Sequence, residues 1–207
     1  GGRAEMRANI DTWWPHVAGA DGRDPIEAII MNASGCGVTV KEYGHILKDD
    51  PVYADKARRV VSLLKDPAEM LPQWMPRLQH ALRRRSSQLG AVAFHPPCSF
   101  SHVLKLSSAV KQGPVETCLR ELGFEVRLAA CDSHQCCGAG GAYSILQPEL
   151  SEPLRQAKVA ALTATGAPVV ASANIGCISH LQGGMSQPVK HWIELIDEAI
   201  SQGADVR

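Results

Sequence analysis

The arrangement of four cysteines constrains this chain more than any other feature of its sequence. Cys136 and Cys137 are adjacent and run directly into Gly138, while Cys98 lies upstream and Cys177 downstream. Gaps of 37 and 39 residues separate the pair from these two cysteines, so each gap has room for a strand and a helix. Ligands spaced so widely can meet only on a folded scaffold. The pattern therefore predicts a metal-cluster site assembled by tertiary structure.

Length and charge limit the classes of partner. The chain has 207 residues, 45% of them apolar, and its 21 basic and 21 acidic side chains give a net charge of zero, which is typical of globular units without a nucleic-acid partner. The dense basic run at residues 83–85 is expected at a helix end. No apolar run approaches the roughly 18 residues needed to span a bilayer, and no signal-peptide pattern opens the chain. We therefore expect a cytoplasmic protein.

The cysteine content indicates chemistry rather than disulfide stapling. Seven is an odd number in a chain too large to need disulfides, so a reducing compartment with metal-binding or redox-active thiols is expected. Cys118 lies beside leucines in a helical stretch and is expected to be a buried core thiol, and Cys131 a structural thiol. Cys36 stands alone and is expected to be an orphan.

Short apolar runs alternate with helical patterns along the chain. Strands are expected at residues 25–31, 91–94, 124–128 and 168–172. Helices are expected at residues 9–17, 114–122, 148–163 and 191–200, and over about 38–89 with breaks near Pro51, Pro67, Pro72 and Pro76. Strands that alternate with helices form a parallel sheet, so this is an α/β chain. The carboxyl ends of such strands share one edge, where the four cysteines would converge.

The sequence also contains an internal echo. Residues 29–36 resemble residues 169–177, and each segment is followed by a helical stretch that contains histidine and leucine. This predicts a partial duplication. We expect residues 1–89 to form an incomplete first repeat with a helical connection, and residues 90–207 to form a complete second, cysteine-rich domain.

Three motifs give the chain a specific resemblance. Residues 94–98 (FHPPC), 133–138 (SHQCCG) and 172–182 (SANIGCISHLQ) resemble the cysteine-rich CCG domain of the glycolate oxidase iron-sulfur subunit. Residues 32–37 and 41–45 are similar to its preceding repeat, so the resemblance covers nearly the whole chain. The wider family includes heterodisulfide reductase and lactate-oxidising iron-sulfur subunits.

The resemblance implies a fold of two Rossmann-like βαβ repeats, the first incomplete, and a function in electron transfer. An FAD-containing subunit would oxidise glycolate to glyoxylate, and this chain would pass electrons through a 4Fe-4S type cluster, cubane or noncubane, toward a quinone-type acceptor. The chain alone is not expected to be catalytic. It would work in a complex with further subunits that associates peripherally with the inner face of the cell membrane. A lactate or glycerol-phosphate system remains an alternative.

Two parts of the family pattern are absent. The ferredoxin-like region and the first cysteine-pair motif are missing, so we expect the carboxy-terminal portion of such a subunit. The closing Cys-x-x-Cys of the family is replaced here by Cys177-Ile178-Ser179-His180. His180 therefore either substitutes for a ligand or points away.

The resemblance implies a cofactor site made by Cys98, Cys136, Cys137 and Cys177, with His180 and Gly138 as further contacts. Thiolates suit iron-sulfur clusters, and glycine amides near the sulfurs can tune the potential. His95 and His134 precede cysteines and are expected to donate hydrogen bonds to sulfur or to move protons.

Other chemistries fit parts of the pattern. A single tetrahedral zinc could be held by Cys98, one cysteine of the pair, Cys177 and His180, which would make the domain a structural or docking module. An exposed cysteine pair of lowered pKa could instead serve a thiol-disulfide oxidoreductase. The glycine-rich turn is a poor phosphate cradle, because it matches neither the dinucleotide fingerprint nor the P-loop.

Overall fold

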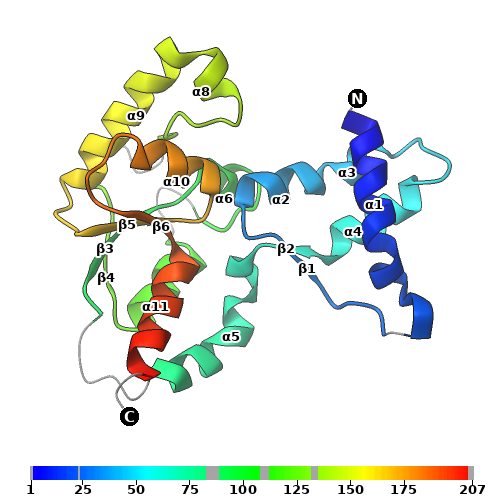
Figure 1. Ribbon diagram of the computed structural model, residues 1–207, viewed down its shortest axis with the longest axis horizontal. Helices are drawn as coiled ribbons and strands as arrows, with labels where there is room; N and C mark the ends of the chain where they lie inside the picture. The colour runs from blue at the N-terminus through cyan, green and yellow to red at the C-terminus, as the bar shows by residue number, and fades with distance from the viewer. Residues whose placement is uncertain (1, 23, 83–88, 108–111, 132–134, 205–207) are drawn as a thin grey trace. The chain divides into compact units, whose positions relative to one another are not determined.

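The fold is taken from a computed structural model that describes residues 2–22, 24–82, 89–107, 112–131 and 135–204 (Figure 1). The chain divides into two compact units, Gly1–Pro67 and Ala68–Arg207. Both contain parallel strands connected through helices, which confirms the α/β class. The expectation of two repeats with a boundary near residue 89 stays a prediction.

The first unit is mainly helical. Its elements are α1 (Gly2–Ala18), the 3₁₀ turn η1 (Ala20–Gly22), β1 (Ile29–Ile30), α2 (Ser34–Lys41), α3 (Tyr43–Ile46), α4 (Ala54–Leu63) and β2 (Leu64–Lys65). The two short strands pair in parallel. A core that includes Ile10, Val40, Leu47 and Val60 joins α1, α2 and α4.

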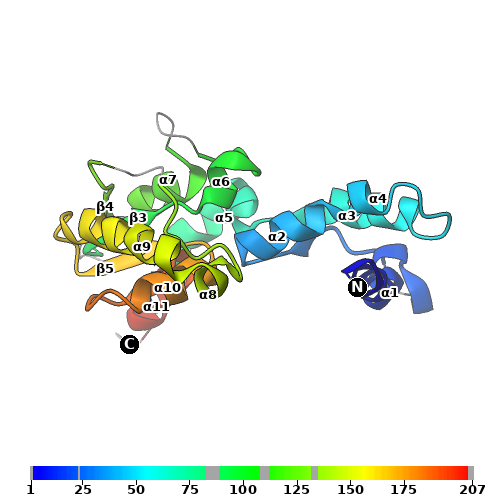
Figure 2. The same ribbon diagram turned by 90° about the horizontal axis from the view of Figure 1, so that it is seen from above.

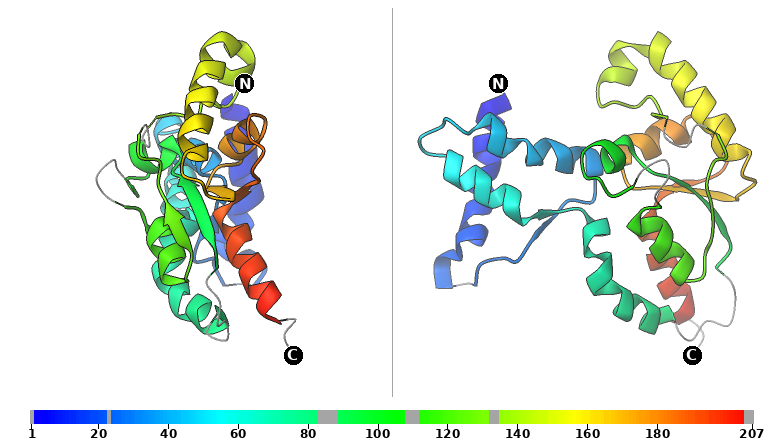
Figure 3. Two further views of the ribbon diagram at one scale, coloured as in Figure 1. Left: turned by 90° about the vertical axis from the view of Figure 1, so that its left-hand side faces the viewer. Right: turned by 180° about the vertical axis from the view of Figure 1, so that it is seen from behind.

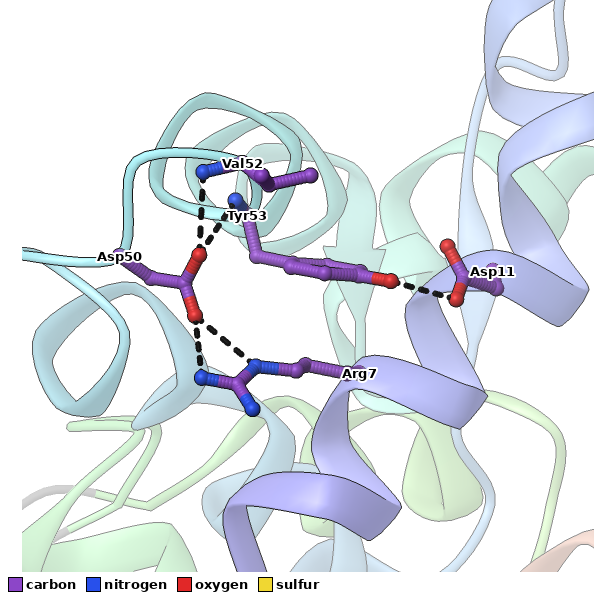
Figure 4. A network of polar contacts seen from close by, with 5 residues as sticks. All are labelled: Arg7, Asp11, Asp50, Val52 and Tyr53. Carbon is purple, nitrogen blue, oxygen red and sulfur yellow. Dashed lines mark hydrogen bonds and ion pairs between the residues drawn. The ribbon is translucent and has the colours of Figure 1, made fainter.

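A polar network fastens α1 to the turn before α4 (Figure 4). Arg7 donates from Nε and Nη2 to Oδ2 of Asp50, at 2.8 and 2.6 Å. The other oxygen of Asp50 accepts hydrogen bonds of 3.0 Å from the amides of Val52 and Tyr53, and the Tyr53 hydroxyl donates to Asp11 at 2.6 Å. The pKa of Asp50 is lowered, mainly by the hydrogen bond from Val52. The network is closed and fits a structural role.

The second unit contains a sheet of four parallel strands in the order β4-β3-β5-β6. Its elements are α5 (Pro67–Leu82), β3 (Ala91–His95), α6 (Cys98–His102), α7 (Pro114–Glu121), β4 (Glu125–Arg127), α8 (Tyr143–Leu146), α9 (Pro148–Thr163), β5 (Val169–Ser172), α10 (Ile175–Gln182), β6 (Val189–His191) and α11 (Trp192–Ala204). The chain leaves β3 toward β4 on one side and later adds β5 on the other. The order of connection therefore reverses at β3.

Two hydrophobic cores cover the two faces of this sheet. Val92 and Phe94 of β3 pack with α5, α7 and α11, whereas Ala93 between them packs with α9 and α10. Figures 1 and 3 show α9 and α10 on one side of the sheet and α7 and α11 on the other. Seen from above, α9 covers the sheet (Figure 2). This alternation follows from strand geometry, in which successive side chains point to opposite faces.

Most elements predicted for the second unit are present. The structure has α9 over the expected residues, and β3, β4, β5, α7 and α11 lie within a few residues of their predicted positions. The predicted breaks at Pro72 and Pro76 are wrong, because α5 continues through both prolines. Leu71, Met75 and Leu78 pack into the core, and this burial offsets the backbone hydrogen bonds that proline removes.

The remaining differences concern short strands. The strand expected at residues 25–31 contains only Ile29–Ile30, and Ile30 is 41% exposed rather than buried. Neither β2 nor β6 was predicted, since two or three residues carry no readable alternation. Residues 83–85 lie outside the described residues. Among the helices that the structure describes, none has the length and apolar character required to cross a membrane.

Candidate metal centre

The four cysteines converge at the carboxyl edge of the sheet in the second unit. Cys98 begins α6 just after β3, and Cys177 lies in the first turn of α10 just after β5. Cys136 and Cys137 follow β4. Because the connection reverses at β3, the loops after β3 and β5 diverge there, and open α/β sheets bind ligands at such a point. The structure therefore brings together the residues that the sequence spacing singled out.

Their sulfurs form a hydrogen-bonded series. Cys136 is hydrogen-bonded to Cys137 and Cys98, and Cys137 is also hydrogen-bonded to Cys177. Contact with Cys137 lowers the pKa of Cys136, with Cys98 contributing, and a separate contact with Cys137 lowers the pKa of Cys177 to about 5. Contact with Cys136 raises the pKa of Cys98, and contacts with Cys136 and Cys177 raise that of Cys137, whose single S–H can donate to one of them at a time. Two of the four sulfurs, those of Cys136 and Cys177, thus favour the thiolate form, whereas Cys98 and Cys137 favour the thiol form.

His95 lies close to two of these cysteines, Cys137 and Cys177. It is the last residue of β3 and is only 1% exposed. Three potential metal-ligand atoms lie within 4.8 Å of one another: a ring nitrogen of His95 and the Sγ atoms of Cys137 and Cys177. Sequence reasoning gave His95 only a supporting role. The signal that could have placed it was its position at the end of a strand, on the same face as Ala93.

The turn after the cysteine pair requires glycine at position 138. Gly138 has φ +89°, and a Cβ there would lie 2.6 Å from the Ser151 carbonyl oxygen. Its amide donates to Cys136 Sγ at 3.3 Å, while the Ser151 hydroxyl donates to the Gly138 carbonyl at 2.8 Å. At the other end of the group, the Asn174 amide donates to Cys177 Sγ at 3.6 Å. These donors further stabilise charge on the sulfurs.

His180 contacts this turn rather than the sulfur group. Its Nε2 lies 3.2 Å from Ser151 Oγ. Since that hydroxyl already donates to Gly138, its oxygen accepts from the Nε2–H of His180. Burial lowers the pKa of His180. The part of His180 in cofactor binding stays a prediction, and the contact through Ser151 and Gly138 is what the structure describes.

The other three cysteines do not join the group. Cys118 is buried in the core of α7, as expected, and burial raises its pKa to about 12. Cys36 and Cys131 are exposed. All seven cysteines lie in the described part of the chain, and none of them forms a disulfide. His134 lies outside the described residues.

The donor set defines the chemistry that the site can support. Soft thiolates and an imidazole, largely buried, suit iron-sulfur clusters and zinc, whereas magnesium and calcium prefer oxygen ligands. Cys137 and Cys177 are 1% and 5% exposed, while Cys98 and Cys136 are partly accessible. The site therefore has a buried side and a side open toward the surface.

Comparison with known proteins agrees with this geometry. Residues 92–182 match the family described as the cysteine-rich CCG domain. The chain is 42% identical over 202 residues to the glycolate oxidase iron-sulfur subunit of Escherichia coli K12, covering 97% of this chain and 46% of that protein. It is 32% identical over 164 residues to the probable glycolate oxidase iron-sulfur subunit of Bacillus subtilis, covering 78% and 35%.

A relative of lower identity carries a name that refers to lactate. Lactate utilization protein A of Bacillus licheniformis is 26% identical over 164 residues, which cover 79% of this chain and 65% of that protein. The chain thus spans about half the length of the Escherichia coli relative and about a third of the Bacillus subtilis one. Residues 92–182, which match the cysteine-rich CCG domain, carry the four converging cysteines.

Proposed function

We propose that this chain is part of an iron-sulfur electron-transfer subunit, and that Cys98, Cys136, Cys137 and Cys177 bind its cluster. The observation that carries the proposal is the meeting of these four thiols, from three separate strand ends, at one edge of a CCG-family domain. Ordinary burial of cysteine would not place them together. It would also not require glycine at position 138.

The residues present fit a 4Fe-4S type cluster, cubane or noncubane. When bound, such a cluster supplies one-electron transfer. The protein would supply thiolates, and the amides of Gly138 and Asn174, which donate to two of the sulfurs, would tune the potential. Burial of Cys137 and Cys177 would limit the access of water to a cluster held here. Cys98 and Cys136 are partly accessible, so a cluster held here would be reachable from the surface on their side.

The proposed complex is a glycolate oxidase or dehydrogenase. The relatives' names support glycolate as the substrate of the whole assembly, with lactate as the alternative. An FAD-containing subunit would oxidise glycolate to glyoxylate, and this subunit would carry the electrons toward a quinone-type acceptor. We place the complex in the cytoplasm, at the inner face of the cell membrane. This chain would then contribute electron transfer and no substrate chemistry.

One observation favours zinc as a second candidate. Ligand atoms of His95, Cys137 and Cys177 lie within 4.8 Å of one another, close enough for one metal ion to contact all three. Zinc takes four such nitrogen and sulfur ligands, and Cys136 is hydrogen-bonded to Cys137 beside them. The domain would then be a structural module of the complex.

The test is the content of iron, zinc and acid-labile sulfide in the 207-residue chain, purified without oxygen. We expect iron with matching sulfide, lost in Cys136→Ser and Cys177→Ser. The matched control is Cys36→Ser, which changes an exposed cysteine outside the group and should retain both. Circular dichroism would check that each variant folds. Zinc without sulfide would replace the electron-transfer proposal with the structural one.

A further inference from the structure

The position of His95 is fixed by its pairing with β5 and by the alternation of side chains along β3. The hydroxyl of Ser172 donates to the backbone carbonyl of His95 at 2.9 Å, and the two residues are paired in register between β3 and β5. Val92 and Phe94 lie in one core and Ala93 in the other. Since strand side chains alternate, His95 faces the same side as Ala93, which is the side of Cys137 and Cys177.

The ring of His95 is buried but lacks ordinary partners. Neither Nδ1 nor Nε2 makes a hydrogen bond of normal geometry with any residue that the structure describes. The polar contact of the ring is instead with the sulfur of Cys177, another residue of the proposed site. Buried polar atoms in proteins are nearly always paired, so an exception needs an explanation. A neutral imidazole also carries one lone pair that can bind a metal.

We propose that His95 is a ligand of the metal group held at this site, beside Cys137 and Cys177. The three ligand atoms already lie within 4.8 Å of one another, and all three residues are buried. The inference rests on the proposed function in one respect, namely that the cysteines hold a metal group. A nitrogen ligand among thiolates raises the reduction potential of an iron-sulfur cluster.

His180 is the natural control for this proposal. It is a second histidine close to the site, but its Nε2 bonds to Ser151 and not to a sulfur. It is also absent from the group of mutually close ligand atoms. Substitution of His180 therefore perturbs the surroundings of the cysteines without removing a ligand.

The direct test uses protein labelled with ¹⁵N in its histidines and purified without oxygen. Iron and sulfide are measured first, because their absence would count against the proposed function alone. Pulsed electron paramagnetic resonance of the reduced protein should then show the strong ¹⁵N coupling of a bonded nitrogen. We expect this coupling to be lost in His95→Gln and kept in His180→Gln. An iron-loaded wild type that shows no strong coupling, or a coupling that survives in His95→Gln, would overturn the proposal.

Two further measurements cover failure of the first variant to fold or to load. His95→Cys replaces the nitrogen by a thiolate, so we expect retained iron and a lowered potential; an unchanged potential would contradict a bonded His95. If the chain holds no iron, Co²⁺ titration under nitrogen reports the same ligands through visible absorption. We expect Co²⁺ to bind at least about tenfold more weakly to His95→Gln than to His180→Gln. Equal affinities would overturn the proposal.

Discussion

Two polar assemblies in this protein differ in how their groups are satisfied. In the first unit, the charged groups of Arg7, Asp11 and Asp50 are bonded to one another or to Tyr53 and nearby amides (Figure 4). In the second unit, the cysteines share protons among themselves, and His95 is buried without an ordinary partner among the described residues. One assembly is complete as it stands, and the other is not.

The difference separates structure from function. An unsatisfied buried polar group costs about 1–3 kcal/mol, so folding alone does not favour it. A bound metal would remove that cost by using the lone pairs that the site leaves open. The network around Asp50 gains nothing from a ligand, because both of its carboxylate oxygens already have partners. Substitutions in and around the two assemblies test this contrast.

The largest effect is expected at the turn that shapes the cysteine site. Gly138→Ala should lower stability by about 3 kcal/mol and abolish metal binding, because positive φ is strained for alanine and its Cβ would clash with the Ser151 carbonyl. Gly141 also has positive φ, but a Cβ there meets nothing within 4 Å, so Gly141→Ala should cost only about 1 kcal/mol. Urea unfolding and iron content measure both. Equal losses in the two variants would contradict the role of the close contact.

A smaller loss is expected when the support of that turn is removed. Ser151 is buried and links the Gly138 carbonyl to His180, so Ser151→Ala should cost about 1–2 kcal/mol and weaken metal retention. The control is Ser186→Ala at an exposed serine. Urea unfolding measures the stability, and the iron retained after dialysis against a chelator measures metal retention. A variant as stable and as well loaded as the control would show that the turn holds without Ser151.

The contrast also shows how far the sequence could predict the fold. Helices α7 and α9 and strands β3 and β5 were predicted, because their apolar pattern and flanking prolines or glycines agree with their final structure. The continuity of α5 was not predictable from local rules, since Pro72 and Pro76 both disfavour a helix interior. Packing of that helix in the core decides the outcome, and packing is not a local property.

For the site, the sequence indicated which cysteines would meet but not which histidine would join them. The convergence followed from strands that end before cysteines in a parallel sheet. The direction of a side chain depends on register and packing, so His95 and His180 could not be distinguished by spacing. Cys36 and Cys177 stand in similar sequences, yet Cys36 is exposed and Cys177 is 5% exposed within the site.

The network of the first unit should respond to acid. The pKa of Asp50 lies below its ordinary value of 3.8, so its contribution to stability is present above that pH and is lost as pH falls toward the folded pKa. Asp50→Asn should therefore lower the melting temperature by a few degrees at neutral pH. It should also reduce the further fall in melting temperature as the solution is made acidic. The exposed neighbour Asp49 offers the control Asp49→Asn. Thermal unfolding followed across pH, without added metal, measures the effect. If the melting temperature of Asp50→Asn falls as steeply in acid as that of the wild type, other carboxylates cause the loss of stability in acid.

The smallest effect tests whether every unpaired buried atom indicates a ligand. Glu116 lies in α7 and is 2% exposed, and its Oε2 has no hydrogen-bond partner among the described residues. It does not belong to the group of mutually close metal-ligand atoms. The neighbouring Gly113 and Thr117 line a cavity of about 530 Å³. Burial raises the pKa of Glu116 above its ordinary value of 4.5, so a protonated carboxyl accounts for the site without a ligand.

The sign of the pH dependence follows from that shift. Below about pH 4.5 both folded and unfolded chains hold the proton of Glu116, and as pH rises the unfolded chain loses it first. Stability therefore falls as pH rises from there toward the folded pKa. Glu116→Gln cannot ionise, so we expect it to gain less than about 1 kcal/mol at neutral pH, measured by urea unfolding. Thr117→Val is the control at the same cavity. Destabilisation by Glu116→Gln at neutral pH would show instead that the carboxylate is charged and binds a cationic group, and an unpaired buried atom would then indicate a ligand in this case as well.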